Sequence, residues 1–322
     1  MRRNSFIKNR HKDVRTRMKR DFLSLAAYER NELEKVINLA SRLKARREEG
    51  TEKLRGKTLG MIFQKPSTRT RVSFEVAMNQ LGGQAIYLGW NDLQLGRGET
   101  IADTAKALSR YVDAIVARVN RHEDIEELAR NASVPVINGL SDRFHPCQAL
   151  ADLLTIEEKM GRLEAVKVAF VGDATNVCNS LMIGCAKMGA DISVAGPKEY
   201  QPKRDVVDIA IKSAKDSGSQ IIVTSDPFEA VKGADIIYTD TFVSMGLETE
   251  KEKRLSVFVP KYQVNKRLLE STGKKTYFMH CLPAHRGGEV TAEVIDGKSS
   301  IVWDQAENRL HAQKALLIYL LL

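Results

Sequence analysis

Hydroxyl and guanidinium groups are concentrated in one run of five residues, Ser-Thr-Arg-Thr-Arg at 67–71. The run stands between an apolar, strand-like segment at 57–63 and a helix-like segment that we expect to begin near Phe74. Backbone N–H groups at a helix N-terminus lack intrahelical partners and lie at the positive end of the helix dipole, and guanidinium groups bind oxyanions through paired hydrogen bonds. The run therefore predicts a phosphate-binding site. Taken alone, it is also compatible with an ordinary helix cap beside exposed arginines that have no role.

Three further blocks combine residue types that can do chemistry: His-Pro-Cys-Gln at 145–148, Asp-Thr-Phe-Val-Ser-Met-Gly at 240–246 and His-Cys-Leu-Pro at 280–283. In addition, Arg118 follows an apolar run, where its guanidinium can donate to a carbonyl or phosphate oxygen. A structural arginine there would instead extend to solvent or pair with an acid. His145 offers a neutral donor, although a histidine before a proline is most often a capping or packing residue.

Length and composition limit the class of protein. The chain has 322 residues, of which 43% are hydrophobic and 28% charged, which suits a globular protein of two domains. No apolar run approaches the roughly 18 to 20 residues that a membrane-spanning helix needs. Four cysteines form no C-x-x-C pair, which disfavours a disulfide framework and a structural zinc site. We therefore expect a protein of the reducing cytoplasm.

The formal net charge of +9 is unevenly distributed. Residues 1–17 carry seven Lys or Arg and one Asp, a charge of +6, so the rest of the chain carries only +3. We interpret 1–17 as a disordered basic tail or as upstream sequence translated from an early start. Organelle targeting is less favoured, because Ser5 and Thr16 are its only hydroxyl residues and no amphipathic face is evident. Nucleic-acid binding is the alternative from another functional class, and we expect little of it in the rest of the chain.

Apolar and β-branched runs alternate with helical patterns along most of the chain. The spacing of apolar residues between Leu33 and Leu43 predicts an N-terminal amphipathic helix. Short apolar runs predict strands at 57–63, 85–88, 114–119, 135–138, 166–171, 192–195, 221–224, 236–239, 277–280 and 301–303. This alternation predicts an α/β protein with helices covering parallel sheets. A break near 149–161 divides the strands into two doubly wound parallel-sheet domains, with a bridging helix at 145–159.

Ligands of doubly wound sheets bind beyond the carboxyl ends of the strands, so we expect an interdomain active-site cleft. Six polar residues lie at or just after predicted strand ends: Ser67, Arg118, Asn138, Asp173, Asp240 and Cys281. The strand at 166–171 runs into Gly172 as a dinucleotide-binding strand does, but the glycine pattern that follows in such proteins is absent, which disfavours a dehydrogenase. Gly-Lys-Ser at 297–299 lacks the upstream glycine of a P-loop, so we expect a turn there.

The run at 67–71 resembles the carbamoyl phosphate loop of the aspartate and ornithine carbamoyltransferases. The blocks at 145–148, 240–246 and 280–283 resemble further motifs of the ornithine branch, in the family's order and roughly its spacing, and the similarity extends from about Met18 to the C-terminus. The resemblance implies transfer of the carbamoyl group of carbamoyl phosphate to the side-chain amine of L-ornithine, giving L-citrulline and phosphate, in arginine metabolism. It implies no cofactor and no metal.

The resemblance also implies how the chain is divided. Residues 18–150 would form a carbamoyl-phosphate-binding domain, and residues 151–306 an ornithine-binding domain. A C-terminal helix at 307–322 would pack back on the first of these.

Site residues follow from the same resemblance, position by position. Carbamoyl phosphate would be bound by Ser67, Thr68, Arg69, Thr70, Gln94, Arg118, His145, Gln148, Cys281, Leu282 and Arg309. Ornithine would be bound by Asn176, Asp240, Ser244 and the backbone of Met245. Catalytic roles fall to Arg118 and His145, which with Thr70 polarise the carbamoyl oxygen, and to Cys281, which faces the reacting amine. Covalent catalysis by Cys281 with His280 as its base is disfavoured, because adjacent side chains of a strand point to opposite faces.

Partners are implied in the same way. Gln94 matches a family loop that reaches the phosphate site of an adjacent subunit, which implies a homotrimer or a multiple of trimers. The expected ligands are the two small-molecule substrates, with no nucleic acid and no membrane. A putrescine carbamoyltransferase is the nearest rival, but the block at 240–246 favours a substrate with an amino-acid head group. An aspartate substrate is disfavoured by Cys281.

Overall fold

The computed structural model describes residues 19–46, 50–244, 246 and 248–322. The predictions for the tail 1–17 and for Met245 therefore lie outside the described residues. Among the helices described, none combines the length and apolar character needed to cross a bilayer.

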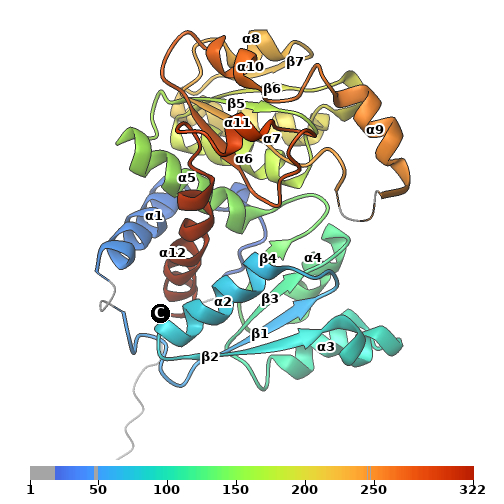
Figure 1. Cartoon of the computed structure of the whole chain (residues 1–322). Helices are drawn as coiled ribbons and strands as arrows, with labels where there is room; N and C mark the ends of the chain where they lie inside the picture. The colour runs from blue at the N-terminus through green and yellow to red at the C-terminus, as the bar shows by residue number, and fades with distance from the viewer. Residues whose placement is uncertain (1–18, 47–49, 245, 247) are drawn as a thin grey trace, which may run out of the picture.

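The first sheet has four parallel strands in the order β2-β1-β3-β4 (Figure 1). Its strands are β1 (Thr58–Phe63), β2 (Gln84–Gly89), β3 (Ala114–Arg118) and β4 (Val136–Leu140). The helices that follow them are α2 (Thr68–Gln80), α3 (Ile101–Leu108) and α4 (His122–Asn131), with short 3₁₀ turns η2 (Trp90–Asp92) and η3 (Gln94–Arg97) after β2. Residues of β1 and β3 are almost all buried, whereas the edge strand β2 is largely solvent-accessible.

The second sheet has five parallel strands in the order β7-β6-β5-β8-β9 and forms the upper lobe of Figure 1. Its strands are β5 (Lys167–Val171), β6 (Asp191–Ala195), β7 (Ile221–Thr224), β8 (Ile236–Thr239) and β9 (Tyr277–His280). Its helices are α6 (Asn176–Met188), α7 (Arg204–Ser217), α8 (Pro227–Val231), α9 (Lys251–Phe258), α10 (Lys266–Glu270) and α11 (Ala292–Ile295), with 3₁₀ turns η4 (Lys198–Tyr200) and η5 (Glu248–Glu250). The predicted α/β fold with two doubly wound parallel sheets is confirmed.

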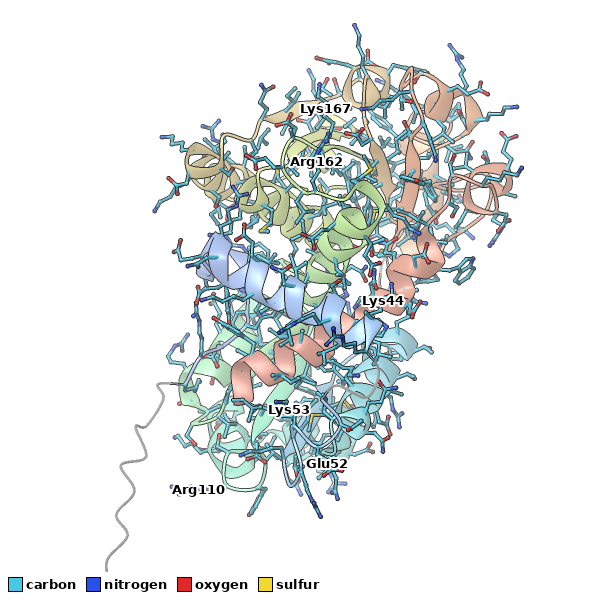
Figure 2. All side chains as sticks on the ribbon, turned by 90° about the vertical axis from the view of Figure 1, so that its left-hand side faces the viewer. Lys44, Glu52, Lys53, Arg110, Arg162 and Lys167 are labelled. Carbon is cyan, nitrogen blue, oxygen red and sulfur yellow. The ribbon has the colours of Figure 1, made fainter. Side chains whose placement is uncertain are left out.

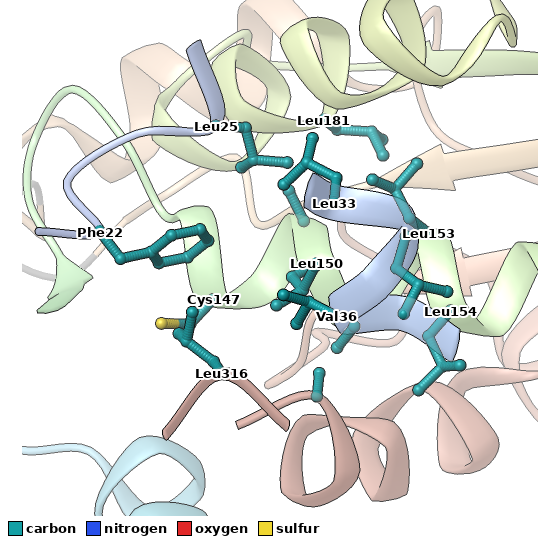
Figure 3. Packing of buried hydrophobic residues seen from close by; sticks show 14 of the residues in the cluster. Phe22, Leu25, Leu33, Val36, Cys147, Leu150, Leu153, Leu154, Leu181 and Leu316 are labelled. Atoms are coloured by element: carbon teal, nitrogen blue, oxygen red, sulfur yellow. The ribbon is translucent and has the colours of Figure 1, made fainter. Parts of the chain in front are cut away.

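Three long helices join the two sheets: α1 (Arg30–Ala45), α5 (Pro146–Met160) and α12 (Val302–Leu321) (Figure 1). Before α1, the 3₁₀ turn η1 (Leu25–Ala27) packs on α6. Helix α12 packs against α1, α2 and α5. Figure 3 shows the apolar cluster between these helices, in which Val36 of α1, Leu150 of α5 and Leu316 of α12 are buried. This shared core fixes the two sheets relative to each other, since burial of apolar surface is the main stabilising term.

Hydrogen bonds also join the three long helices. Figure 2 shows α1 crossing α12, with Lys44 near the crossing. Its Nζ donates to Asn308 Oδ1 at 2.8 Å and to Glu158 Oε2 at 2.9 Å, and so ties α1 to α12 and α5. The other labelled side chains of Figure 2 lie on the two lobes, away from this crossing.

The structure corrects three predicted boundaries. Residues 301–303 are not a strand: Ile301 precedes α12, and Val302 and Trp303 form its first turn. Three apolar residues cannot distinguish a strand from the start of an amphipathic helix, since the two periodicities need a longer window. For the same reason the last helix begins at Val302 and not near Glu307. Helix α2 begins at Thr68 and not near Phe74, because Ser67 caps it.

Candidate active site

A cleft with a volume of about 970 Å³ opens between the carboxyl ends of the two sheets. Thirteen of the predicted site residues line it: Ser67, Thr68, Arg69, Thr70, Arg118, His145, Gln148, Asn176, Asp240, Ser244, Cys281, Leu282 and Arg309. Strand register explains much of this convergence. Phe63, at the end of β1, pairs with Arg118 of β3, so the loop to Ser67 and the Arg118 side chain share one edge. Thr239 pairs with His280, so the next residues, Asp240 and Cys281, follow neighbouring strands.

The N-terminus of α2 forms one end of the cleft. Ser67 is the N-cap and its Oγ accepts from the Thr70 backbone N–H at 3.3 Å. No acidic side chain stands in the first turn of α2, and Arg69 and Thr70 in that turn line the cavity. Backbone amides at a helix N-terminus, the helix dipole and the hydroxyls of one turn are groups that can bind an anion.

Three arginines surround that end: Arg69, Arg118 and Arg309. Burial, followed by the charges of Arg309 and Arg69, lowers the pKa of Arg118 to about 10. Burial also lowers the pKa of Arg309, whose Nη1 donates to Gln148 Oε1 at 2.8 Å and whose Nη2 donates to Thr70 Oγ1 at 3.2 Å. Within the described chain, the Nε groups of Arg118 and Arg309 are buried without a hydrogen-bond partner. Like charges held together with unused donors favour a multiply charged anion between them.

His145 stands beside these arginines at the N-cap of α5, where Pro146 occupies the first helical position. Its backbone N–H donates to Ser180 Oγ at 2.8 Å, which fixes the start of the helix on α6. Burial, together with Arg309, Arg118 and Arg69, lowers the pKa of His145 well below its ordinary value. The ring is therefore neutral at pH 7, and its Nδ1 has no hydrogen-bond partner in the described part of the chain. A neutral imidazole can contact a reacting oxygen without adding charge to the cluster.

Asp240 and Cys281, which follow β8 and β9, line the same cleft. The Cys281 thiol donates to Asp240 Oδ1 at 2.9 Å. Burial and the Asp240 carboxylate raise the pKa of Cys281 well above its ordinary value, so the sulfur is a neutral thiol at pH 7. A neutral thiol is a poor nucleophile. His280 does not activate it, because His280 Nδ1 accepts from the Leu282 backbone N–H at 2.8 Å.

The same groups offer possible metal ligands. Ligand atoms of Asp240, His280 and Cys281 lie within 4.8 Å of one another. The thiol donates to the carboxylate and His280 Nδ1 accepts from the Leu282 N–H, while His280 Nε2 lies 3.3 Å from Glu289 Oε1 without a hydrogen bond among the described residues. These contacts compete with metal coordination, which needs a thiolate and a free imidazole nitrogen.

Another part of the cleft is built by α6 and the segment after β8. Asn176 occupies the first turn of α6, and its Nδ2 donates to the Ser141 carbonyl at 2.6 Å. Ser244 lines the cavity at the end of the segment that begins with Asp240. A helix N-terminus beside an acidic side chain can take the carboxylate and the ammonium of an α-amino acid respectively.

A buried ion pair that the sequence did not reveal supports this segment. Arg254 of α9 pairs with Asp173, and its Nε also donates to the Phe242 carbonyl at 2.6 Å. Both charged residues are buried. The sequence places Asp173 at a predicted strand end, but Arg254 lies in a charged run typical of a solvent-exposed helix. Nothing in the sequence near Arg254 therefore indicates that it is the buried partner of Asp173.

Two further predicted residues are Leu282 and Gln94, of which only Leu282 lies in the cleft. Leu282 lines the cleft with φ of +60°, a left-handed conformation that a leucine adopts only under constraint. Gln94 is exposed on η3 and is not among the described residues that line this chain's own cavity.

Comparison with known proteins agrees with this geometry. Residues 20–158 match the family model described as the carbamoyl-P binding domain of aspartate/ornithine carbamoyltransferase, and residues 164–320 match its Asp/Orn binding domain.

Individual relatives are similar over most of the chain. The ornithine carbamoyltransferase of Bacillus subtilis is 62% identical over 262 residues, which cover 81% of this chain and 82% of that protein. The anabolic ornithine carbamoyltransferase of Pyrococcus furiosus is 58% identical over 300 residues, 92% of this chain and 95% of that protein. A solved structure of ornithine carbamoyltransferase from Pyrococcus furiosus superposes with a TM-score of 0.91 at 57% identity, covering 94% of this chain and 97% of that one.

Proposed function

The chain belongs to the aspartate/ornithine carbamoyltransferase family, and from this premise we propose how its cleft carries out ornithine carbamoyltransferase activity. The enzyme transfers the carbamoyl group of carbamoyl phosphate to the side-chain amine of L-ornithine and releases L-citrulline and phosphate. One observation carries the assignment of roles: an arginine-rich anion site and a hydrogen-bonded Asp240–Cys281 pair face one cavity.

The phosphate of carbamoyl phosphate binds at the N-terminus of α2, between the amides and hydroxyls of residues 67–70 and the guanidinium groups. The arginine cluster supports this placement, because burial and, after it, repulsion from Arg309 and Arg69 lower the pKa of Arg118, and a bound dianion would offset both effects. Bound in this way, the leaving phosphate is already stabilised when the C–O bond breaks.

The carbamoyl carbonyl lies toward Arg118, His145 and Thr70. When the amine attacks, charge develops on this oxygen, and donors placed there in advance stabilise it more strongly than the ground-state carbonyl. Gln148 takes the carbamoyl NH₂ through its side-chain oxygen. Support comes from the hydrogen bond that Arg309 makes to this oxygen, which fixes the oxygen on the cleft side of the amide.

The amine must be neutral to attack. Its pKa in water is about 10.4 by analogy with lysine, so deprotonating it at pH 7 costs about 4 to 5 kcal/mol. We place the proton relay at the Cys281–Asp240 pair, and because the thiol keeps its own proton, the carboxylate is the accepting end.

The amino-acid head group of ornithine extends from this pair. Asn176 and the Met245 backbone bind the α-carboxylate, and Asp240 and Ser244 bind the α-ammonium. The position of Asn176 at the N-terminus of α6 supports the carboxylate site, because that helix end attracts negative charge. Putrescine lacks this head group and would leave these polar groups unpaired.

The assembly is a homotrimer or a multiple of trimers, in which Gln94 serves the cleft of an adjacent subunit. The exposed position of Gln94 on η3 supports this arrangement. Further support comes from the neighbouring surface of α2 and β2, where Val72 is 51% exposed and Ile86 48% exposed. Exposed apolar residues beside an edge strand are typical of a protein interface. We place the enzyme in the cytoplasm and, following the anabolic relative, in arginine biosynthesis.

A substrate panel tests the function. Purified protein is incubated with carbamoyl phosphate and, separately, L-ornithine, putrescine, L-lysine and L-aspartate, and both the ureido product and phosphate are measured. We expect citrulline and phosphate in equal amounts with ornithine and little product with the others. Preference for putrescine would overturn the head-group assignment, and absence of ureido product from all four amines would overturn the function.

A further inference from the structure

Asp152 is a fully buried carboxylate that the proposed mechanism does not use. It lies on α5, one turn after Gln148, and is not among the described residues that line the cleft. Three donors converge on it. Gln148 Nε2 and Gln305 Nε2 donate to Oδ1 at 2.8 and 2.7 Å, and the Tyr238 hydroxyl donates to Oδ2 at 3.2 Å. A buried acid held by three donors from three elements is costly to desolvate, which calls for a reason beyond filling space.

The first consequence concerns the amide of Gln148. An ionised carboxylate accepts hydrogen bonds but cannot donate, so it fixes the NH₂ of Gln148 on its own side. The amide oxygen must then point the other way, toward Arg309, whose Nη1 donates to it at 2.8 Å. Arg309 in turn reaches Thr70 in the first turn of α2. Asp152 thereby sets the orientation of a side chain that touches the anion end of the cleft.

The second consequence concerns the opposite sheet. Gln305 Oε1 accepts from the His280 backbone N–H at 2.9 Å, and Gln305 Nε2 also donates to the Tyr238 hydroxyl at 2.9 Å. Tyr238 and His280 lie on β8 and β9, which end immediately before Asp240 and Cys281. The same carboxylate is therefore anchored to the strands that carry the amine end of the cleft.

We propose that Asp152 is a positioning residue for carbamoyl transfer, which holds Gln148 in one amide orientation and through it places Arg309 at the carbamoyl phosphate site. The inference rests on the proposed function. Burial raises the pKa of Asp152 to about 7, against the hydrogen bonds that lower it, so the carboxylate form depends on these donors staying in place. A purely structural role would instead make Asp152 one more contact between α5 and α12.

The test uses Asp152→Leu, which keeps a similar shape but removes both oxygens that accept from Gln148, Gln305 and Tyr238. Thr155→Val is the matched control, because Thr155 is equally buried on α5 and accepts from Asn308 of α12 at 2.9 Å, one turn farther from Gln148. For each variant, thermal unfolding and the KM values for both substrates are measured. We expect Asp152→Leu to raise the KM for carbamoyl phosphate at least about tenfold and the KM for ornithine less than about threefold, since a misplaced donor loses about one charged hydrogen bond. Thr155→Val should change thermal stability and neither KM.

A second, milder variant, Asp152→Asn, keeps the inference testable if Asp152→Leu does not fold. Gln148 Nε2 and Gln305 Nε2 donate to the same oxygen of Asp152, so the single oxygen of asparagine can still accept from both, with its NH₂ group on the side of Tyr238. Gln148 then keeps its orientation, and we expect the KM for carbamoyl phosphate to stay within about threefold of the parent.

Three outcomes would overturn the inference: an unchanged KM for carbamoyl phosphate in folded Asp152→Leu, the same KM increase in Thr155→Val, or an increase of about tenfold or more in Asp152→Asn. The unaltered enzyme is assayed in parallel. Inactivity of that protein would count against the proposed function, whereas normal activity with any of the three outcomes counts against the role of Asp152 alone.

Discussion

Replacing Arg118 by Met should make the ligand-free enzyme more stable and far less active. Burial and the charges of Arg309 and Arg69 lower the pKa of Arg118 from its ordinary value to about 10, a shift that corresponds to about 3 kcal/mol of unfavourable free energy for its charge in the folded state. At pH 7 the guanidinium is charged in both the folded and the unfolded chain, so the folded state carries this cost. Methionine fills similar space without charge. We therefore expect a gain of about 1 to 3 kcal/mol in the free energy of unfolding and a rise of a few degrees in Tm.

Activity should move in the opposite direction. Loss of one preorganised donor to a developing oxyanion typically lowers kcat by about 10² to 10³. The KM for ornithine should change much less, because Arg118 lies at the anion end of the cleft. The assays are steady-state citrulline formation and thermal unfolding without ligand. The control is Arg110→Met, at an exposed arginine on the lower lobe of Figure 2, which should change neither quantity. A variant at Arg118 with kcat within about threefold of the parent, or with a lowered Tm, would refute the reasoning.

Three further predictions concern reactivity and stability. Burial and the Asp240 carboxylate raise the pKa of Cys281, so its alkylation by iodoacetamide should stay slow from about pH 7 to pH 9 and should be faster in Asp240→Asn. The alkylation rate is measured by mass spectrometry. A rate that has already levelled off at pH 7 would show that the sulfur is a thiolate. Arg254→Met leaves the Asp173 carboxylate buried without its partner and should lower the free energy of unfolding, measured by urea titration, by about 3 to 5 kcal/mol. The control Arg204→Met breaks the exposed pair with Asp208 and should lower it by less than about 1 kcal/mol. Equal losses in the two variants would contradict the argument that burial decides the energy of an ion pair. Gln313 is fully buried, and neither its Nε2 nor its Oε1 has a hydrogen-bond partner within the described residues. Gln313→Met should therefore raise the free energy of unfolding by about 1 to 3 kcal/mol. A loss of stability in the same urea titration would indicate a partner such as buried water.

Local sequence patterns were sufficient for the architecture. The parallel strands are apolar runs separated by helical periods, and strand ends carry polar residues such as Arg118 and Asp240. These patterns depend on neighbours a few residues apart, which is why both sheets could be predicted. Sequence motifs also indicated where the site lies, since residues 67–70 contain the cap and the hydroxyl groups of one helix turn.

The remainder depends on contacts between distant parts of the chain. Arg254 pairs with a carboxylate 81 positions away, and Gln305 meets Asp152 from a position 153 residues later. Neither partner has a distinctive local pattern, so only the packed fold identifies them. The predicted start of the last helix was wrong for a related reason. Val302 and Trp303 could belong to a strand or to a helix, and only the packing of α12 against α5 distinguishes the two.

Binding of a non-hydrolysable phosphonate analogue of carbamoyl phosphate in the crystal would test the central claim most directly. We expect its phosphonate at the N-terminus of α2, within hydrogen-bond distance of the amides of residues 67–70 and of Arg69, with its carbonyl oxygen toward Arg118 and His145. A phosphonate bound elsewhere in the cleft, with the α2 N-terminus empty, would contradict it.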